Sequence, residues 1–250
     1  MADRFSAAVI GIAATQPMLM DYGDGMTSAE VYELNRDQIA KEIEEVEAEF
    51  RRVLSPTVAD LGWRSASIFT SLADYMAREA RGADVVITGV DATSAFDNMR
   101  RVNTGDLIMQ AGRPVLLVPT LADKPKLARM MIGWKDTRES RRAVVDALPL
   151  LRIATHVSLV EIRAEDERSA SADRLADVAA WLKRHGVAAE CHYAPSAGDD
   201  ATALFALGED HAIDLTVAGA YGHSRLREWV LGGVTRDLLV SVNRCSLVSH

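Results

Sequence analysis

The fold is decided by the stretch TVAGAYGHSRLREWVLGGVTRDLL (216–239), in which an apolar run ends at a glycine and more glycines follow. Gly219 and Gly222 allow a tight turn out of a strand, because glycine has no Cβ and tolerates positive φ. Gly232 and Gly233 stand where the next helix is expected to begin, and helix N-termini expose unpaired N–H groups. This arrangement predicts a phosphate cradle. The alternative is a plain strand-to-helix connection made of small residues.

Composition and charge limit the classes of protein to be considered. The chain has 250 residues and a formal net charge of −8, which suits one large domain or two of about 125 residues. It has no long run of Lys and Arg, so nucleic-acid binding is not expected. No apolar stretch reaches the roughly 18 to 20 residues of a membrane span, and the N-terminus does not resemble a signal peptide. We therefore expect a cytoplasmic protein.

The two cysteines predict neither a disulfide framework nor a metal site. Cys191 and Cys245 are far apart in the sequence and are not part of a CxxC motif or of a zinc-ligand spacing. We expect both to be reduced thiols.

Strands and helices are predicted to alternate, which favours an α/β fold with mainly parallel strands. Several of the strands are short continuous apolar runs, as expected of strands covered on both faces. The predicted strands are 7–14, 62–67, 84–90, 114–119, 129–134, 156–162, 188–194, 214–220 and 245–249.

Three helices have clear sequence signals. The first begins at a capping box formed by Thr27 and Glu30, and the second, 138–151, follows Thr137. The third, 169–185, ends at Gly186, a common C-terminal stop. The first helix carries an apolar stripe at steps of three and four residues, made of Ile39, Ile43, Val46, Phe50 and Val53.

The chain contains an internal repeat. Residues 104–119 align with 235–250, and residues 82–90 align with 212–220. Segment 6–14 likewise aligns with 155–163, and helix 71–80 aligns with the helix around 200–210. A polar linker at 121–126 places the boundary near Lys124, so we expect one domain at 1–123 and a second at 124–250.

The first copy is shorter at its start. A strand and a helix, 127–154, precede the aligned strand in the second copy, whereas only 5 residues precede it in the first, a deficit of 23 residues. Three outcomes follow for the missing strand: its neighbours pair directly, the gap is filled, or a strand is borrowed from another chain. We expect a distorted, smaller sheet whose stability depends on the second domain. An alternative is that the true start lies upstream of Met1.

These residues resemble the universal stress proteins (UspA-like). Gly219, Gly222 and Gly232 match that family's nucleotide loop, which reads Gly, two residues, Gly, nine residues, Gly and then Ser or Thr. Because the chain contains two copies of the repeat, it is similar to the universal stress proteins that have two domains in tandem. The resemblance implies Rossmann-like domains with five parallel strands in the order 3-2-1-4-5 and ATP at the strand ends in some members. It also implies pairing of last strands, here 114–119 with 245–249, within the chain as a pseudo-dimer or in a homodimer.

Two positions depart from the family pattern. In ATP-binding members the loop after the first strand has a sequence similar to Asp-Gly-Ser. This chain has Lys135 in the acidic position, followed by Asp136 and Thr137. An ammonium cannot accept a hydrogen bond, and one lost bond costs about 1 to 3 kcal/mol. Gly233 takes the final Ser/Thr position. Thr235, two residues on, either replaces that hydroxyl or packs in the helix.

The resemblance implies a nucleotide site in the second copy only, because the first copy has no paired glycines after Gly89. His223, Arg225 and Arg227 either screen the charge of a triphosphate or are simply solvated. Arg138, Arg141 and Arg142 are explained by an exposed helix face. The predicted nucleotide-binding residues are Gly219, Gly222, His223, Arg225, Gly232, Gly233, Thr235, Lys135, Asp136 and Thr137.

Two functions follow from this site. The first is a stress-response protein that binds ATP, with or without Mg²⁺, and is at most a slow ATPase, because no catalytic constellation stands out in the sequence. The second is an interaction or dimerisation module of the same fold that binds no nucleotide. An adenylate-transfer enzyme is a third possibility, for which the sequence offers no second substrate pocket.

Overall fold

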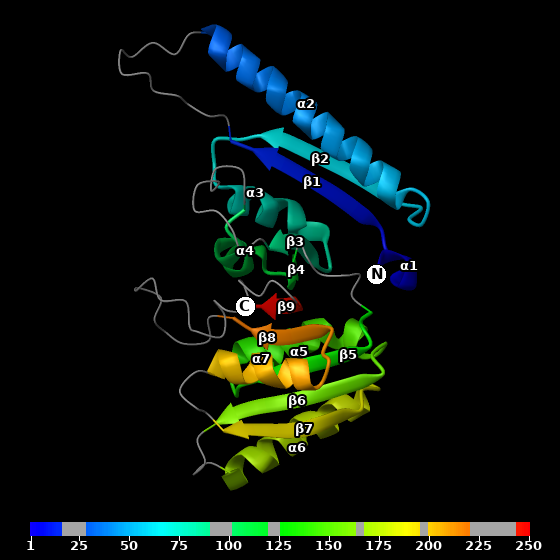
Figure 1. Ribbon diagram of the computed structural model, residues 1–250, viewed down its shortest axis with the longest axis vertical. Coiled ribbons are helices and arrows are strands. Elements are labelled where there is room, and N and C mark those ends of the chain that lie inside the picture. Colours follow the sequence, from blue (N-terminus) through cyan, green and yellow to red (C-terminus); the bar gives the residue numbers. More distant parts are fainter. Residues whose placement is uncertain (17–28, 91–101, 120–125, 164–167, 196–199, 221–243) are drawn as a thin grey trace, which may run out of the picture. The chain divides into compact units, whose positions relative to one another are not determined.

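The structure is a computed structural model that describes residues 1–16, 29–90, 102–119, 126–163, 168–195, 200–220 and 244–250 (Figure 1). Contacts divide its elements into two compact units. The first holds the elements from α1 (Ala2–Phe5) to α3 (Leu72–Glu79), and the second holds those from the 3₁₀ turn η1 (Ala80–Gly82) to β9. The boundary that we expect near Lys124 concerns the two sequence copies and stays a prediction. The compact units divide earlier in the chain.

The second unit is built on a seven-stranded sheet in the order β3-β4-β9-β8-β5-β6-β7. The five strands of the second copy thus follow the order 3-2-1-4-5, which confirms the predicted fold class. Each of the nine predicted strands is present, with ends within two residues of the expected ones. The strands of this sheet are β3 (Val86–Val90), β4 (Val115–Pro119), β5 (Arg129–Trp134), β6 (His156–Arg163), β7 (Ala189–Pro195), β8 (Leu215–Gly219) and β9 (Cys245–Ser249).

The two copies are joined by an antiparallel ladder between their last strands. Leu116 of β4 lies opposite Leu247 of β9, and the neighbouring pairs are Val115 with Val248 and Leu117 with Ser246. The other pairs in the sheet are parallel. The pairing expected of 114–119 with 245–249 is therefore present within one chain.

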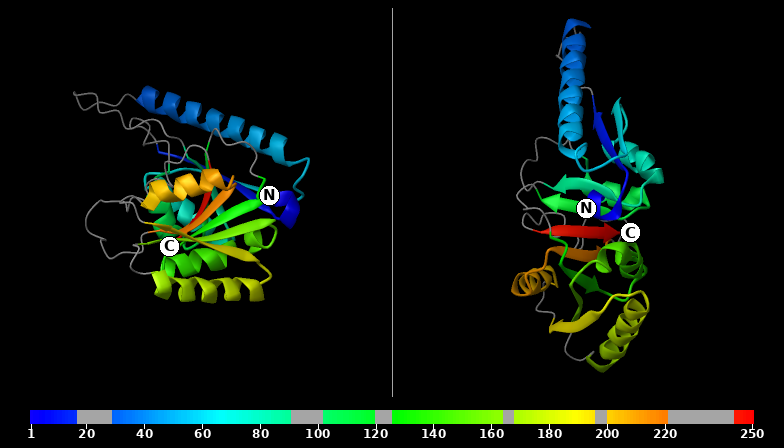
Figure 2. Two further views of the ribbon diagram at one scale, coloured as in Figure 1. Left: turned by 60° about the horizontal axis from the view of Figure 1, so that its bottom comes forward. Right: turned by 90° about the vertical axis from the view of Figure 1, so that its right-hand side faces the viewer.

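Helices cover both faces of the second copy's strands. Helices α5 (Arg138–Leu151) and α6 (Arg168–Arg184) lie on one face and α7 (Asp200–Asp210) lies on the other (Figure 2). Helix α5 begins after Thr137 as predicted, and α6 is followed by Gly186 at φ +85°. The inner side of α5 belongs to the main core cluster through Ala143, Val144, Ala147, Leu148 and Leu151.

A carboxylate fixes the start of β5. Oδ2 of Asp214, the residue before β8, accepts hydrogen bonds from the backbone N–H groups of Ala128 and Arg129, both at 2.9 Å. The Arg129 side chain in turn donates to the carbonyl oxygen of His211 at 2.5 Å. Because β5 and β8 are parallel neighbours, this clamp sets their register at the amino-terminal edge of the sheet.

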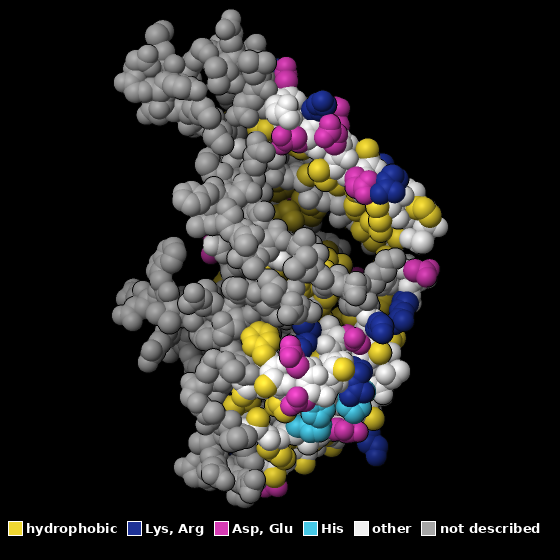
Figure 3. Space-filling model, in the orientation of Figure 1, with side chains coloured by type: hydrophobic (Ala, Val, Ile, Leu, Met, Phe, Trp, Pro, Cys, Tyr) yellow, Lys and Arg dark blue, Asp and Glu magenta, His cyan; other side chains and the backbone are white. Residues whose placement is uncertain are grey.

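The first unit contains the parallel pair β1 (Val9–Thr15) and β2 (Leu61–Ser67), on which α2 (Ala29–Leu54) packs. The rings of Phe50 and Trp63 are 5.3 Å apart, and Ile39 is buried. The predicted inner stripe of α2 is wrong at two positions, because Val46 and Val53 are 54% and 52% exposed. A two-stranded sheet is too narrow to cover the whole stripe, and hydrophobic side chains are visible at the surface of α2 (Figure 3). Thr27, of the predicted capping box, lies outside the described residues.

The sheet expected of the first copy is divided between the units. Among the described residues β1 pairs with β2 alone, and β3 pairs with β4 alone. Direct pairing of β1 with β3, one of the three outcomes considered for the missing strand, is therefore not found there. Strands β3 and β4 instead extend the sheet of the second copy, in line with the smaller sheet that we expect to depend on the second domain.

We predict that Gly11→Ala destabilises the first unit by about 1 to 3 kcal/mol. A Cβ at Gly11 would overlap the indole ring of Trp63 and lie 3.1 Å from Phe50. Urea unfolding followed by tryptophan fluorescence measures the change. Gly82→Ala is the matched control, because a Cβ there meets nothing within 4 Å. Equal unfolding midpoints for the two variants would contradict the packing that we describe.

Candidate functional site

The turn after β5 leads directly into α5. Trp134 ends the strand in a buried position, whereas Lys135 and Asp136 are exposed. Thr137 is the N-cap of α5: its backbone is extended, and its hydroxyl accepts a hydrogen bond from Ser140 N–H at 3.3 Å. The Thr137 hydroxyl, predicted as a nucleotide contact, is thus already used in capping.

Gly219, the last residue of β8, packs against the first turn of α5. A Cβ added to Gly219 would lie 2.5 Å from the carbonyl carbon of Glu139 and 2.5 Å from the backbone nitrogen of Ser140. Such distances exclude any side chain at this position. The contact brings the end of β8 to the N-terminus of α5, so Gly219 and the Lys135–Thr137 turn meet at the same edge of the sheet, as predicted.

Glu139 is a buried carboxylate at this junction that the sequence reading did not find. It is 3% exposed, and Oε2 has no hydrogen-bond partner among the described residues, while Oε1 accepts from Arg138. Burial acts to raise the pKa of this carboxyl. Hydrogen bonds from Arg138, its own backbone and Thr137 outweigh burial, so the pKa lies below its ordinary value. The one sequence signal for Glu139 is an acidic residue in the first turn of a helix.

The charged residues around the turn are largely paired with each other. Arg141 binds Asp136 at 2.9 Å in an exposed pair, and Arg142 binds Asp146, whose side chain is mostly covered, at 3.0 Å. Within the described ranges Lys135 has no ion pair, and its side chain is exposed. At the position where the family pattern has an acid, the turn therefore presents a cation that has no ion-pair partner among the described residues.

The C-terminal residues fix the point at which the chain leaves β8. Ala220 N–H donates to the carbonyl oxygen of Ser249 at 2.8 Å, and His250 Nδ1 lies 3.2 Å from the carbonyl oxygen of Ala220. The glycine segment therefore begins at a defined place beside α5. Six predicted site residues lie outside the described residues: Gly222, His223, Arg225, Gly232, Gly233 and Thr235.

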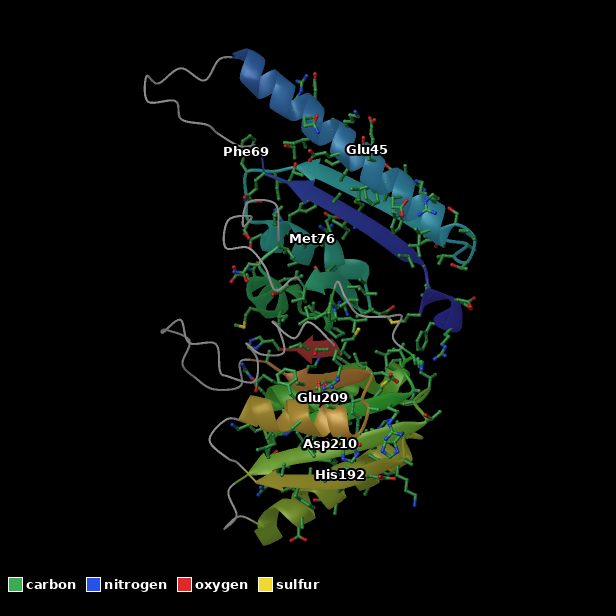
Figure 4. The ribbon with its side chains drawn as sticks, in the orientation of Figure 1. Glu45, Phe69, Met76, His192, Glu209 and Asp210 are labelled. Carbon is green, nitrogen blue, oxygen red and sulfur yellow. The ribbon has the colours of Figure 1, made fainter. Side chains whose placement is uncertain are left out.

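A group of histidines lies elsewhere, on the face covered by α7. The rings of His192 and His211 are 4.9 Å apart, and Nε2 of His192 and of His156 are 3.8 and 3.7 Å from Glu190 Oε2. His192 lies near the end of α7, where Asp210 is labelled (Figure 4), and cyan His side chains gather beside acidic ones in Figure 3. Burial and neighbouring imidazoles lower the pKa of His192.

Among the described residues these histidines are not arranged as a metal centre. In the part of the chain that the structure describes, no group of three His, Cys, Asp or Glu side chains is arranged to hold a metal ion. The thiols of Cys191 and Cys245 are both free, and burial raises the pKa of each, which disfavours the reactive thiolate. Likewise, none of the described helices combines the length and hydropathy needed to span a membrane.

Comparison with solved structures identifies the fold. A universal stress protein from Archaeoglobus fulgidus DSM 4304 matches 96% of this chain and 86% of its own, with 12% identity and a TM-score of 0.70. The chain has the universal stress protein fold. A putative universal stress protein from Pseudomonas aeruginosa UCBPP-PA14 matches 98% of this chain and 94% of its own, with 14% identity and a TM-score of 0.57.

A universal stress protein solved in complex with cAMP matches 49% of this chain and 97% of its own, with 22% identity and a TM-score of 0.39. Neither a family model nor a curated protein matches the sequence. The likeness to universal stress proteins is therefore a likeness of fold, and it extends over both copies in the two longer matches.

We predict that Gly219→Ala destabilises the second unit by about 1 to 3 kcal/mol, because its Cβ would overlap the backbone of α5. Gly89→Ala is the matched control. Gly89 aligns with Gly219 in the first copy, and a Cβ there would meet its nearest atom, the carbonyl oxygen of Val118, at 3.9 Å. Thermal unfolding followed by circular dichroism compares the two variants, and an equal loss in both would refute the close contact at Gly219.

Proposed function

We propose that the second copy binds ATP, or a related adenine nucleotide, at the carboxyl ends of β5 and β8, and that the protein acts in stress response through this binding. The observation that supports the proposal is the strand order. The chain leaves β5 toward β6 on one side, whereas β8 lies on the other side of β5, and doubly wound sheets bind ligands where the order reverses. The glycine segment starts there, at Gly219.

Two described features favour the phosphate end of a nucleotide. The N-terminus of α5 provides N–H groups and the positive end of the helix dipole, and Lys135, which has no ion pair with any described residue, adds an ammonium beside it. The family-like glycine positions Gly222, Gly232 and Gly233, with Thr235, would supply backbone and hydroxyl donors, and His223 and Arg225 would add positive charge. Mg²⁺, when bound, would neutralise phosphate charge.

The described residues offer fewer hydrogen-bond acceptors for the ribose of the nucleotide. Asp136 is paired with Arg141 through Oδ1, and the Thr137 hydroxyl caps α5, so a sugar hydroxyl would share acceptors that already have partners. Lys135 cannot accept a hydrogen bond at all. We therefore propose that the site holds the nucleotide chiefly by its phosphates.

A second candidate function, an interaction module without nucleotide, is favoured by one observation. Packing against α5 accounts for Gly219 without any ligand. On this alternative the glycine segment is a structural connection, and the last-strand pairing of the two copies is what the fold provides.

We predict that the native protein binds ATP in isothermal titration calorimetry with Mg²⁺ present, and that Gly222→Val weakens or abolishes binding by adding branched methyl groups to the loop. A titration to about 1 mM ATP detects a site with a binding free energy of about −4 kcal/mol. Gly89→Val, in the copy without a nucleotide site, is the control and leaves binding unchanged. Absence of any binding heat in the native protein would reject the proposal in favour of the interaction module.

We predict opposite effects of Lys135→Asp on two ligands. Affinity for adenosine rises roughly tenfold, because a carboxylate restores one hydrogen-bond acceptor. Affinity for inorganic triphosphate falls, because the unpaired cation is replaced by an anion. Lys135→Ala separates the two causes, since it weakens triphosphate binding without strengthening adenosine binding. Equal changes for both ligands would contradict the assignment of Lys135 to the phosphate end.

A further inference from the structure

Strand β3 is the end strand of the seven-stranded sheet. Comparison of the two sequence copies predicts a further strand beside it. By the alignment of 82–90 with 212–220, β3 is the counterpart of β8. Strand β8 is paired on both sides, with β9 and with β5, whereas β3 is paired with β4 alone among the described residues. The outer edge of β3 therefore corresponds to the edge of β8 that β5 occupies.

The backbone of β3 is set to receive a parallel strand. Val86 N–H donates to the carbonyl oxygen of Pro114 at 3.0 Å, so Val86, Thr88 and Val90 direct their backbone groups to β4. Because successive residues of a strand alternate in direction, Ile87 and Gly89 direct theirs to the outer edge. Their N–H and C=O groups are the equivalents of the groups that bind β5 in the second copy.

The exposure of the side chains also indicates a missing neighbour beside β3. Ile87 is 53% exposed, whereas its counterpart Val217 is 0% exposed and belongs to the core cluster that also contains Ile132 of β5 and Val144 of α5. An apolar side chain is thus left uncovered where the second copy has a strand followed by a helix.

A carboxylate at the start of β3 is the most specific observation. Asp84 aligns with Asp214, which clamps the N–H groups of Ala128 and Arg129 at the start of β5. Asp84 is exposed, and none of the described residues forms a hydrogen bond or ion pair with its carboxylate. Within the described ranges the first copy therefore has the clamp carboxylate but no strand for it to hold.

We propose that the outer edge of β3 is a strand-accepting site, which binds in parallel an extended, mainly apolar segment of a partner protein. Asp84 accepts the two N–H groups at the start of that segment, Ile87 and Gly89 supply the ladder bonds, and an amphipathic helix after the segment covers Ile87. The sequence of 127–151 is the template for this partner segment, because it fills the equivalent place in the second copy.

Fluorescence anisotropy with the intact chain tests the site. The probe is a labelled synthetic peptide of residues 127–135, and a longer peptide of 127–151 is expected to bind more tightly because it adds the helix. Asp84→Ala is expected to weaken peptide binding roughly tenfold or more while leaving the urea midpoint unchanged, because the carboxylate is exposed and has no described partner. Ile87→Pro removes an outward N–H and places a ring on the edge, which an edge strand tolerates. It is expected to abolish binding.

Two controls make the site specific. Tyr193→Lys changes the opposite end strand, β7, and is expected to leave peptide binding unchanged. An N-methyl group on Ala128 of the peptide removes one of the N–H groups assigned to Asp84. Its effect and that of Asp84→Ala should therefore be less than additive in a double-mutant cycle.

Several results would overturn the proposal. These are no peptide binding by the native chain, equal binding by the Asp84→Ala and Ile87→Pro variants, or additive effects in the cycle. A dimer in sedimentation that Ile87→Pro dissociates would assign the edge to a second copy. An intact mass above 27.2 kDa for the protein from its own cell would assign the strand to the chain itself.

Discussion

The antiparallel ladder between β4 and β9 is the interaction on which the large sheet depends. It joins the last strand of each copy through three register pairs, and Leu116 and Leu247 at its centre are both in the main core. Two similar units that meet by the same strand do so antiparallel when a two-fold rotation relates them. The ladder thus replaces two sheet edges by a continuous, buried centre, and it makes β3 and β4 part of the second unit.

That arrangement explains why the first copy does not keep a sheet of its own. A strand needs a hydrogen-bonded neighbour and an apolar cover. Strands β3 and β4 obtain a hydrogen-bonded neighbour through β9. Among the described residues β1 pairs with β2 alone, and helices α2 and α3 pack against it. The counterpart of β5 would have joined these two pairs. In the second copy, β5 is bound to β8 at its start through the carboxylate of Asp214, which accepts the N–H groups of Ala128 and Arg129.

Most of the fold could be predicted from the sequence, because the positions of its strands and helices depend on local sequence patterns. Apolar runs located the strands, Thr137 and Gly186 marked helix ends, and the resemblance to universal stress proteins implied the strand order. What escaped prediction depends on distant contacts. The exposure of Val46 and Val53 follows from the width of a two-stranded sheet, and the burial of Glu139 follows from its packing under Gly219. The clamp at Asp214 joins residues more than 80 positions apart, and no local pattern carries it.

The candidate site shows how far a glycine pattern can be interpreted. Gly219 is required by the backbone of α5 alone, so this residue does not distinguish a nucleotide site from a structural connection. The same contact nevertheless brings the N-terminus of α5 to the point where the glycine segment leaves β8. Packing accounts for Gly219, whereas Gly222, Gly232 and Gly233 lie outside the described residues. We therefore expect a phosphate cradle to depend on Gly222, Gly232 and Gly233 together with Lys135, because packing against α5 is enough to explain Gly219.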